Sequence, residues 1–371
     1  MQFNFTDEQK LIRDTVFSAL QEMGDRNRLY DVIEKDGYDR AAWELLCKEL
    51  MLGGTSFAEE YGGSGLSFVE LAIVQEALGQ FLIPTPFYAS IVMAGYAFDL
   101  CGSQAQKETY LPALIAGEKI ATLAYLDCSG HFSADTYAAE LSQTGTLNGQ
   151  SIMVQYAQFA DHIIVLCKSD DGPKLVIVDA KQEGVEITPK TAMDLTRPVG
   201  DVRFENVAIA PENIMPARGE NIAKLFDYAR IMLAVEQMGA AEGVMNLTNT
   251  YAKDRVQFGR PIGSFQAVKH RLADMMVLLE AAKSAAWYAV CTAIEDEAEL
   301  SVAASTASIV CTRAFSKNAA HGIQLHGGMG FTWECMAHLF FKRARTSSHI
   351  LGSPELHREK LADYVFSSNR F

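Results

Sequence analysis

Apolar residues recur at helical spacing near both ends of the chain. Leu11, Val16 and Leu20 share one helical face, and Thr6 before them is a residue type that caps helix N-termini. Glycines end several of these periodic segments, as expected at helix C-termini. The segments predicted as further helices are residues 38–52, 67–78, 221–254, 264–295, 301–321 and 354–367.

The pattern changes between about residues 120 and 211, where short β-rich runs alternate with turns rich in Gly, Asp, Asn and Pro. These runs predict a small β-barrel or sandwich. A Gly-x-Gly-x-x-Gly turn after a strand is missing, which argues against a Rossmann unit. The sequence therefore predicts an α+β fold with a helical region (1–118), a β-domain (119–215) and a C-terminal helical bundle (216–371).

Composition narrows the class of protein further. The chain has 371 residues, 49% of them apolar, and a net charge of −14, which argues against a nucleic-acid surface. Seven scattered cysteines without a Cys-x-x-Cys pair, and no metal-ligand spacing, indicate reduced thiols and no metal site. Neither a secretion signal nor an apolar run of membrane-spanning length is apparent. We expect a cytoplasmic protein without a membrane or nucleic-acid partner.

Two glycine-containing motifs stand out in the C-terminal region. The first, residues 251–275, contains Arg255-Val-Gln257-Phe258-Gly259, and the second, residues 324–334, reads Gln-Leu-His-Gly-Gly-Met-Gly-Phe-Thr-Trp-Glu. Further pieces are Asp-Leu-Thr-Arg-Pro-Val at 194–199 and Tyr-Gly-Gly-Ser-Gly at 61–65, which composition alone would assign to a helix-to-helix connection. Together and in this order, these motifs resemble the flavin-dependent acyl-CoA dehydrogenase family over nearly the whole chain.

The resemblance implies a helical N-terminal domain, a middle β-barrel domain and a C-terminal four-helix bundle. It also implies FAD as cofactor and α,β-dehydrogenation of an acyl-CoA thioester. In the family the Arg-x-x-Phe-Gly turn reaches the FAD of a neighbouring subunit, and a guanidinium suits a pyrophosphate. The purely structural alternatives are that Arg255 caps a helix C-terminus and that Gly327 and Gly328 form a tight turn between helices. The residues placed against FAD are Arg255, Gln257, Phe258, Phe265, Gln266, Gln324, Gly327 and Gly328.

The family's catalytic carboxylate is missing from both of its known positions. Counting onward from the Gly327 motif places Leu351 at the common position, and Ala229 precedes the marker arginine at the alternative one. Neither side chain can accept a proton. Glu236, about two helical turns beyond Ala229, and Glu355, four residues beyond Leu351, are weak candidates for a substitute base.

The β-domain departs from the family pattern as well. The segments that would line the flavin read Ala-Tyr-Leu-Asp-Cys-Ser-Gly at 124–130 and Met-Val-Gln-Tyr-Ala at 153–157, without the family's flavin-lining hydroxyls. This pattern resembles the non-catalytic subunit of heteromeric acyl-CoA dehydrogenases of bacterial steroid or bile-acid side-chain breakdown. The resemblance implies a homologous catalytic partner in a dimer or tetramer and, as the family default, an electron-transfer flavoprotein.

Two other interpretations remain open. One is a self-sufficient homo-oligomeric dehydrogenase with an unusual base such as Glu236. The other is a non-catalytic scaffold or acyl-CoA-binding protein without flavin. Visible absorbance of bound FAD separates the last from the others, and activity of the pure chain separates the first two.

Overall fold

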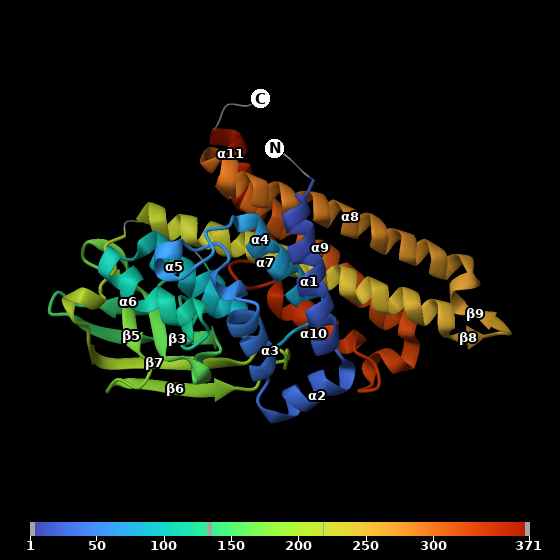
Figure 1. Ribbon diagram of the computed structural model, residues 1–371, viewed down its shortest axis with the longest axis horizontal. Helices are drawn as coiled ribbons and strands as arrows, with labels where there is room; N and C mark the ends of the chain where they lie inside the picture. Colours follow the sequence, from blue (N-terminus) through green and yellow to red (C-terminus); the bar gives the residue numbers. More distant parts are fainter. Residues whose placement is uncertain (1–3, 131, 133–135, 218, 368–371) are drawn as a thin grey trace. The chain divides into compact units, whose positions relative to one another are not determined.

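Helices dominate the first of two units into which the chain divides, which contains residues 1–34, 68–83 and 230–371 (Figure 1). The computed structural model describes residues 4–130, 132, 136–217 and 219–367. The expectation that a secretion signal is absent concerns residues 1–3 as well, and these lie outside the described residues. The helices of this unit are α1 (Asp7–Met23), α2 (Arg26–Lys35), α4 (Phe68–Gln80), α7 (Gly219–Asp254) from residue 230 onward, α8 (Gln266–Glu295), α9 (Leu300–His326), α10 (Ala337–Ser347) and α11 (Pro354–Ser367).

The predicted N-cap of the first helix is present. The Thr6 hydroxyl accepts from the backbone N–H of Gln9, whose side chain in turn accepts from the Thr6 N–H, a reciprocal capping box. Val16 and Leu20 are buried, as the periodicity predicts, whereas Leu11 is 68% exposed. Helix α1 packs along α4.

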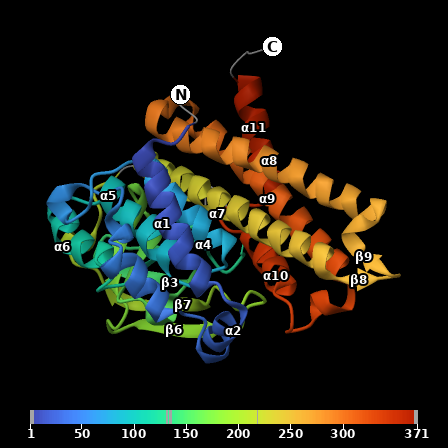
Figure 2. The same ribbon diagram turned by 45° about the vertical axis from the view of Figure 1, so that its right-hand side comes forward.

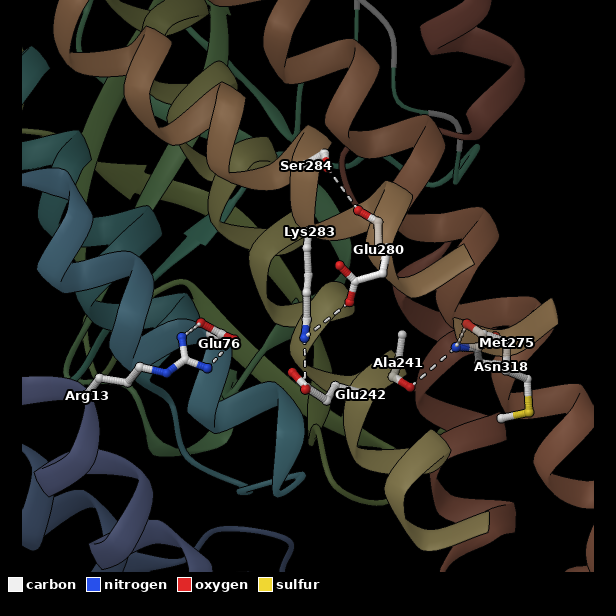
Figure 3. A network of polar contacts seen from close by, with 9 residues as sticks. All are labelled: Arg13, Glu76, Ala241, Glu242, Met275, Glu280, Lys283, Ser284 and Asn318. Carbon is white, nitrogen blue, oxygen red and sulfur yellow. Dashed lines mark hydrogen bonds and ion pairs between the residues drawn. The ribbon is translucent and has the colours of Figure 1, made fainter. Parts of the chain in front are cut away.

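Polar side chains tie the helices of this unit together (Figure 3). Arg13 of α1 forms a bidentate pair with the buried Glu76 of α4, at 2.8 and 3.0 Å. The amide of Asn318 on α9 donates to the carbonyl of Met275 on α8 at 3.1 Å and lies 3.5 Å from the carbonyl of Ala241 on α7. Lys283 of α8 reaches Glu242 of α7 at 2.9 Å. Such buried and partly buried polar contacts fix the positions of the helices relative to one another along their axes, which apolar packing alone would specify less strictly.

The second unit contains residues 35–67 and 84–229 and carries the sheet. Two π-helical turns, Leu45–Glu49 and Tyr88–Gly95, accompany its helices. Its remaining elements are α3 (Arg40–Glu44), α5 (Tyr96–Cys101), α6 (Gln104–Ile115), β1 (Ala121–Ala124), β2 (Ala139–Leu141), β3 (Thr146–Gln155), β4 (His162–Ser169), β5 (Gly172–Asp179), β6 (Val185–Lys190) and β7 (Val199–Ala208).

The sheet is open, and this corrects the predicted β-barrel. Its order is β1–β4–β2–β3–β7–β6, with β5 on the other side of β4. Among the described residues no ladder joins the outer strands β5 and β6, so the sheet does not close. β4 runs parallel to β1 and β2, and the remaining pairs are antiparallel. Short β-rich runs predict strands, but closure depends on shear and tilt that a sequence pattern does not contain.

Several elements escaped prediction. In β3, apolar and polar residues do not alternate regularly, and β6 is short and contains Pro189. Helices α2 and α10 are short and rich in charged residues. The predicted division at residues 118 and 215 follows chain order, whereas the two units follow packing. The division into three regions therefore stays a prediction.

Helix α8 bears on the expectation that no membrane span is present. Within the described part of the chain, it is the one helix whose length and composition would suffice to cross a bilayer. Its apolar residues are dispersed at helical spacing, which is why a search for an uninterrupted run missed it. One face packs closely along α9, with Met275, Leu279 and Ala282 buried. A single such helix is weak evidence for a membrane span.

Candidate functional site

The Arg-x-x-Phe-Gly motif forms a two-residue β-hairpin beyond the end of α7. β8 (Val256–Gln257) pairs antiparallel with β9 (Arg260–Pro261). Phe258 and Gly259, with φ of 55° and 78°, make the turn. Positive φ at both central residues suits a type I′ hairpin and explains the glycine. Figures 1 and 2 both show the hairpin projecting where α7 ends and α8 begins.

The predicted FAD-binding residues of this hairpin point to solvent. Phe258 is 90% exposed, and the Arg255 side chain, also exposed, makes no hydrogen bond or ion pair within the described part of the chain. The Arg255 backbone closes the hairpin, since its carbonyl accepts from the Ile262 N–H at 2.8 Å. The exposed guanidinium is well hydrated, and the exposed Phe258 ring beside it offers an apolar surface that a ligand or partner could cover. Because the Arg255 side chain bonds to no carbonyl at the end of α7 among the described residues, it does not act as a helix cap.

Phe265 and Gln266 lie at the start of α8. The guanidinium of Arg260 covers the Phe265 ring at 4.1 Å, and Phe258 approaches the same ring edge-to-face at 6.1 Å. The Gln266 side chain lies 3.1 Å from the ring of His270, one helical turn on. These contacts hold an aromatic and a polar side chain beside the hairpin, as adenine contacts would require.

The second predicted motif forms a tight turn, Gly327–Phe331, at the end of α9. The Gln324 carbonyl accepts from the Gly327 N–H, and Gly327 has a φ of 60°. A Cβ built on Gly327 or Gly328 would meet nothing within 4 Å. At Gly328 neither backbone strain nor internal packing calls for glycine, so the space above it is available to a ligand. The residues present therefore fit a phosphate-bearing cofactor, because glycines let a phosphate approach the backbone closely, and an arginine whose side chain makes no pair among the described residues can bind it.

Contacts between α7 and the turn bring the two motifs together. The Tyr251 ring stacks on His326 at 4.3 Å, and its hydroxyl lies 3.7 Å from the sulfur of Met329. Arg255 lies about one helical turn beyond Tyr251 along the chain. Tyr251, His326 and Met329 are not among the residues predicted for the site. All three lie within the motifs at 251–275 and 324–334, and this position is the feature of the sequence that could have identified them.

Both positions predicted for the family base are buried and apolar. Leu351 is fully buried, with a φ of 59° that a leucine rarely adopts, and its carbonyl lies 3.4 Å from Nε of Arg230. Ala229 is 1% exposed, and its carbonyl accepts from the Tyr88 hydroxyl at 3.0 Å. Neither residue supplies a proton acceptor on its side chain.

The two substitute candidates lie in very different surroundings. The Glu236 carboxylate is buried between Arg343, at 2.8 Å, and the Gln75 amide, also at 2.8 Å. Glu355 is exposed in the first turn of α11. Its own backbone N–H, the Ser353 hydroxyl and the Arg358 guanidinium lower its pKa. One carboxylate is neutralised and the other is a weakened base, so the structure favours neither for α-proton abstraction.

In the second unit, segment 124–130, predicted to match a flavin-lining segment of the family, makes contacts with residues of the same unit. The Tyr125 ring meets Phe226 edge-to-face at 5.7 Å, and the Asp127 carboxylate accepts from the Ser129 N–H and hydroxyl. Beside them lies an open hollow of about 830 Å³. It is lined by Asp127, Cys128, Ser129, Tyr137, Ala138, Ala139, Glu140, Asn148, Gly149, Gln150 and Lys168.

Cysteine chemistry and metal binding contribute little to the site. Cys128 is exposed and the other six cysteines are buried, all as free thiols. Burial raises the pKa of the Cys167 thiol to about 12. Among the residues described, no group of three or more His, Cys, Asp or Glu side chains could hold a metal ion.

The helical unit thus contains an exposed arginine and two exposed glycines with open space beside them, an arrangement that suits a dinucleotide. Residues 6–118 match the model for the acyl-CoA dehydrogenase N-terminal domain, and residues 218–366 match that for the C-terminal domain. Acyl-CoA dehydrogenase IpdE2 of Mycobacterium tuberculosis is 34% identical over 98% of both chains. The chain belongs to the acyl-CoA dehydrogenase family, whose members use FAD to oxidise CH–CH bonds of acyl-CoA thioesters.

Two solved structures are similar over nearly the full length. A variant of the Tcur3481–Tcur3483 steroid acyl-CoA dehydrogenase superposes with a TM-score of 0.88, at 26% identity over 98% of both chains. The ChsE4–ChsE5 complex of Mycobacterium tuberculosis superposes with a TM-score of 0.91 over 100% of both chains, and at 23% identity it supports the fold alone.

Proposed function

We propose that this chain is the subunit of a heteromeric acyl-CoA dehydrogenase that lacks the catalytic glutamate and completes the FAD site of a homologous catalytic partner. The observation that carries the proposal is the contrast between two places. The hairpin and turn that would serve a neighbour's FAD are open, and the Arg255 side chain makes no pair among the described residues, whereas the predicted base position holds a fully buried Leu351.

When bound, FAD accepts the β-hydride of the acyl thioester. This chain's own residues supply binding and orientation. The Arg255 guanidinium offers planar donors to a pyrophosphate, and Gly327 and Gly328 leave room for the phosphates to approach the backbone. Phe258 and Phe265 present ring faces for an adenine. The partner supplies the carboxylate that removes the α-proton.

The names of the relatives support a steroid-derived acyl-CoA as substrate class. The Tcur3481–Tcur3483 protein is a steroid dehydrogenase formed from two different chains. A cytoplasmic location and an electron-transfer flavoprotein as acceptor belong to the same proposal. A relative at 27% identity is a subunit of a caffeyl-CoA reductase–Etf complex.

The alternative is a self-sufficient homo-oligomer, and Glu236 is its candidate base. The Arg343 pair and deep burial of Glu236 disfavour it. A flavin-free scaffold is disfavoured by the exposure of Arg255 and Phe258, which are predicted to face FAD. The heteromeric function accounts both for the buried pair of Glu236 with Arg343 and for the exposure of the residues predicted to face FAD.

The test compares the chain alone with the chain co-expressed with a homologue that carries glutamate at the position equivalent to Leu351. Dye reduction is assayed with acyl-CoAs that include steroid-side-chain thioesters. Loss of a general base costs about 10²–10⁴ in rate, so we expect the chain alone to fall short of the complex by that factor. Robust turnover by the chain alone would overturn the proposal, and a fall in kcat per folded chain in Glu236→Gln or Glu355→Gln would identify that residue as the base.

A further inference from the structure

His326 ends α9 directly before the two open glycines, and its ring has a fixed orientation. Its side chain is buried, and Nδ1 lies 2.7 Å from the carbonyl oxygen of Gly322. A carbonyl oxygen can only accept a hydrogen bond, so Nδ1 carries the proton and Nε2 keeps its lone pair. Burial lowers the pKa of His326, which agrees with a neutral ring.

Tyr251 extends this fixed orientation across to the turn. The Tyr251 and His326 rings are separated by 4.3 Å between centroids and inclined by 25°, a stacked geometry. The Tyr251 hydroxyl then reaches the sulfur of Met329, inside the turn, at 3.7 Å. A chain of three side chains therefore links the end of α7 to the middle of the Gly327–Phe331 turn.

The glycines of the turn divide into two kinds. A Cβ on Gly330 would lie 2.8 Å from the Ile323 carbonyl and 3.3 Å from the His326 Cβ, so the turn sits directly on the last helical turn of α9. A Cβ on Gly327 or Gly328 would touch nothing. The turn is thus held on one side by Gly330, His326 and Met329, and left open on the other.

We propose that the Tyr251–His326 pair is a positioning device for FAD, which holds the backbone of Gly327 and Gly328 in the orientation that the cofactor requires. An apolar side chain at position 326 would fill the same space. It could not donate the hydrogen bond from Nδ1 to the Gly322 carbonyl, which fixes the plane of the His326 ring. A preorganised turn binds a ligand without a cost for ordering the loop on binding. The inference rests on the proposed function, because FAD must occupy this end of the bundle.

The experiment measures FAD affinity of the assembled oligomer and the melting temperature of the flavin-free protein for four variants. His326→Phe and Tyr251→Phe keep the stack, whereas His326→Leu and Tyr251→Leu remove it. We expect Tyr251→Phe to stay within about three-fold of wild type, since an S–aromatic or S–hydroxyl contact is weak. His326→Phe should bind FAD about ten-fold more weakly, because one buried hydrogen bond is lost. Both leucine variants should bind more weakly still.

A matched control removes a stacked ring elsewhere. Tyr110 stacks on Phe98 at 4.9 Å and 15° in the second unit, and Tyr110→Leu should lower the melting temperature without weakening FAD binding. If all four variants bind FAD like wild type and only the melting temperature falls, the pair is structural and the inference is wrong. If the wild-type oligomer itself binds no FAD, the proposed function fails instead. The half-buried Tyr251 keeps the test available should the His326 variants not fold.

Discussion

The guanidinium of Arg343 on α10 lies 2.8 Å from the carboxylate of Glu236 on α7, with 4% of each side chain exposed. Opposite charges this close and this deeply buried compensate each other's loss of solvation, and the Gln75 amide donates to the second carboxylate oxygen. The carboxylate that sequence reasoning offered as an unusual base is therefore part of the structural core of the first unit.

Removing the charge of Glu236 should damage stability rather than chemistry. Glu236→Gln leaves Arg343 buried without its full counter-charge, so the free energy of unfolding should fall by about 3–5 kcal/mol. Urea denaturation of the purified chain measures this. Activity per folded complex should stay unchanged. The control is Glu355→Gln, whose exposed carboxylate should contribute little to stability.

Arg255→Ala should weaken FAD binding without unfolding the chain. The exposed guanidinium makes no internal pair among the described residues, so the fold loses nothing. A charge-assisted contact with phosphate is worth about 1.5–3 kcal/mol, or about ten- to a hundred-fold in affinity. Titration of the flavin-free oligomer with FAD checks this. Arg313→Ala, an exposed arginine in the middle of α9, is the matched control. Unchanged affinity in Arg255→Ala would leave Arg255 with a structural role only.

Gly328→Ala separates a ligand-facing glycine from a structural one. A methyl group there meets no protein atom within 4 Å, so the melting temperature of the flavin-free protein should hold or rise slightly. FAD affinity should nevertheless fall, because the methyl group would occupy the space of the cofactor. Gly330→Ala should show the reverse order, with folding affected first, since its Cβ would press on the Ile323 carbonyl at 2.8 Å. Equal FAD affinity in Gly328→Ala and wild type would remove the turn from the cofactor site.

Acid should destabilise the chain through His357. Burial, and then the nearby charge of Arg230, lower the pKa of His357 to about 3. Its folded-state pKa lies below the unfolded value, so the stabilisation is present above about pH 6.5 and is lost as pH falls towards the folded pKa. Between pH 7 and 5.5 this group should lower the free energy of unfolding by about 1 kcal/mol. Urea unfolding at both pH values measures it, and His357→Leu should reduce the difference.

The sequence alone determined the family, the order of helical and β-rich regions, and the absence of a carboxylate at positions 229 and 351. These follow from local chemistry: helical periodicity, glycines with special backbone requirements, and side chains that either can or cannot accept a proton. The resemblance also led to Arg255, Phe258, Gly327 and Gly328 as FAD-facing residues, and their openness to solvent supports that prediction.

Only the tertiary structure decided how distant residues pair. The open sheet, the Arg343 partner of Glu236 and the Tyr251–His326–Met329 chain all join segments far apart in sequence, and no periodicity records such contacts. Spacing along α7 could place Glu236 on the same face as Ala229, but it could not show that an arginine 107 residues later would bury and neutralise it. The free energy of a charge depends on what surrounds it in three dimensions, and folding alone supplies those surroundings.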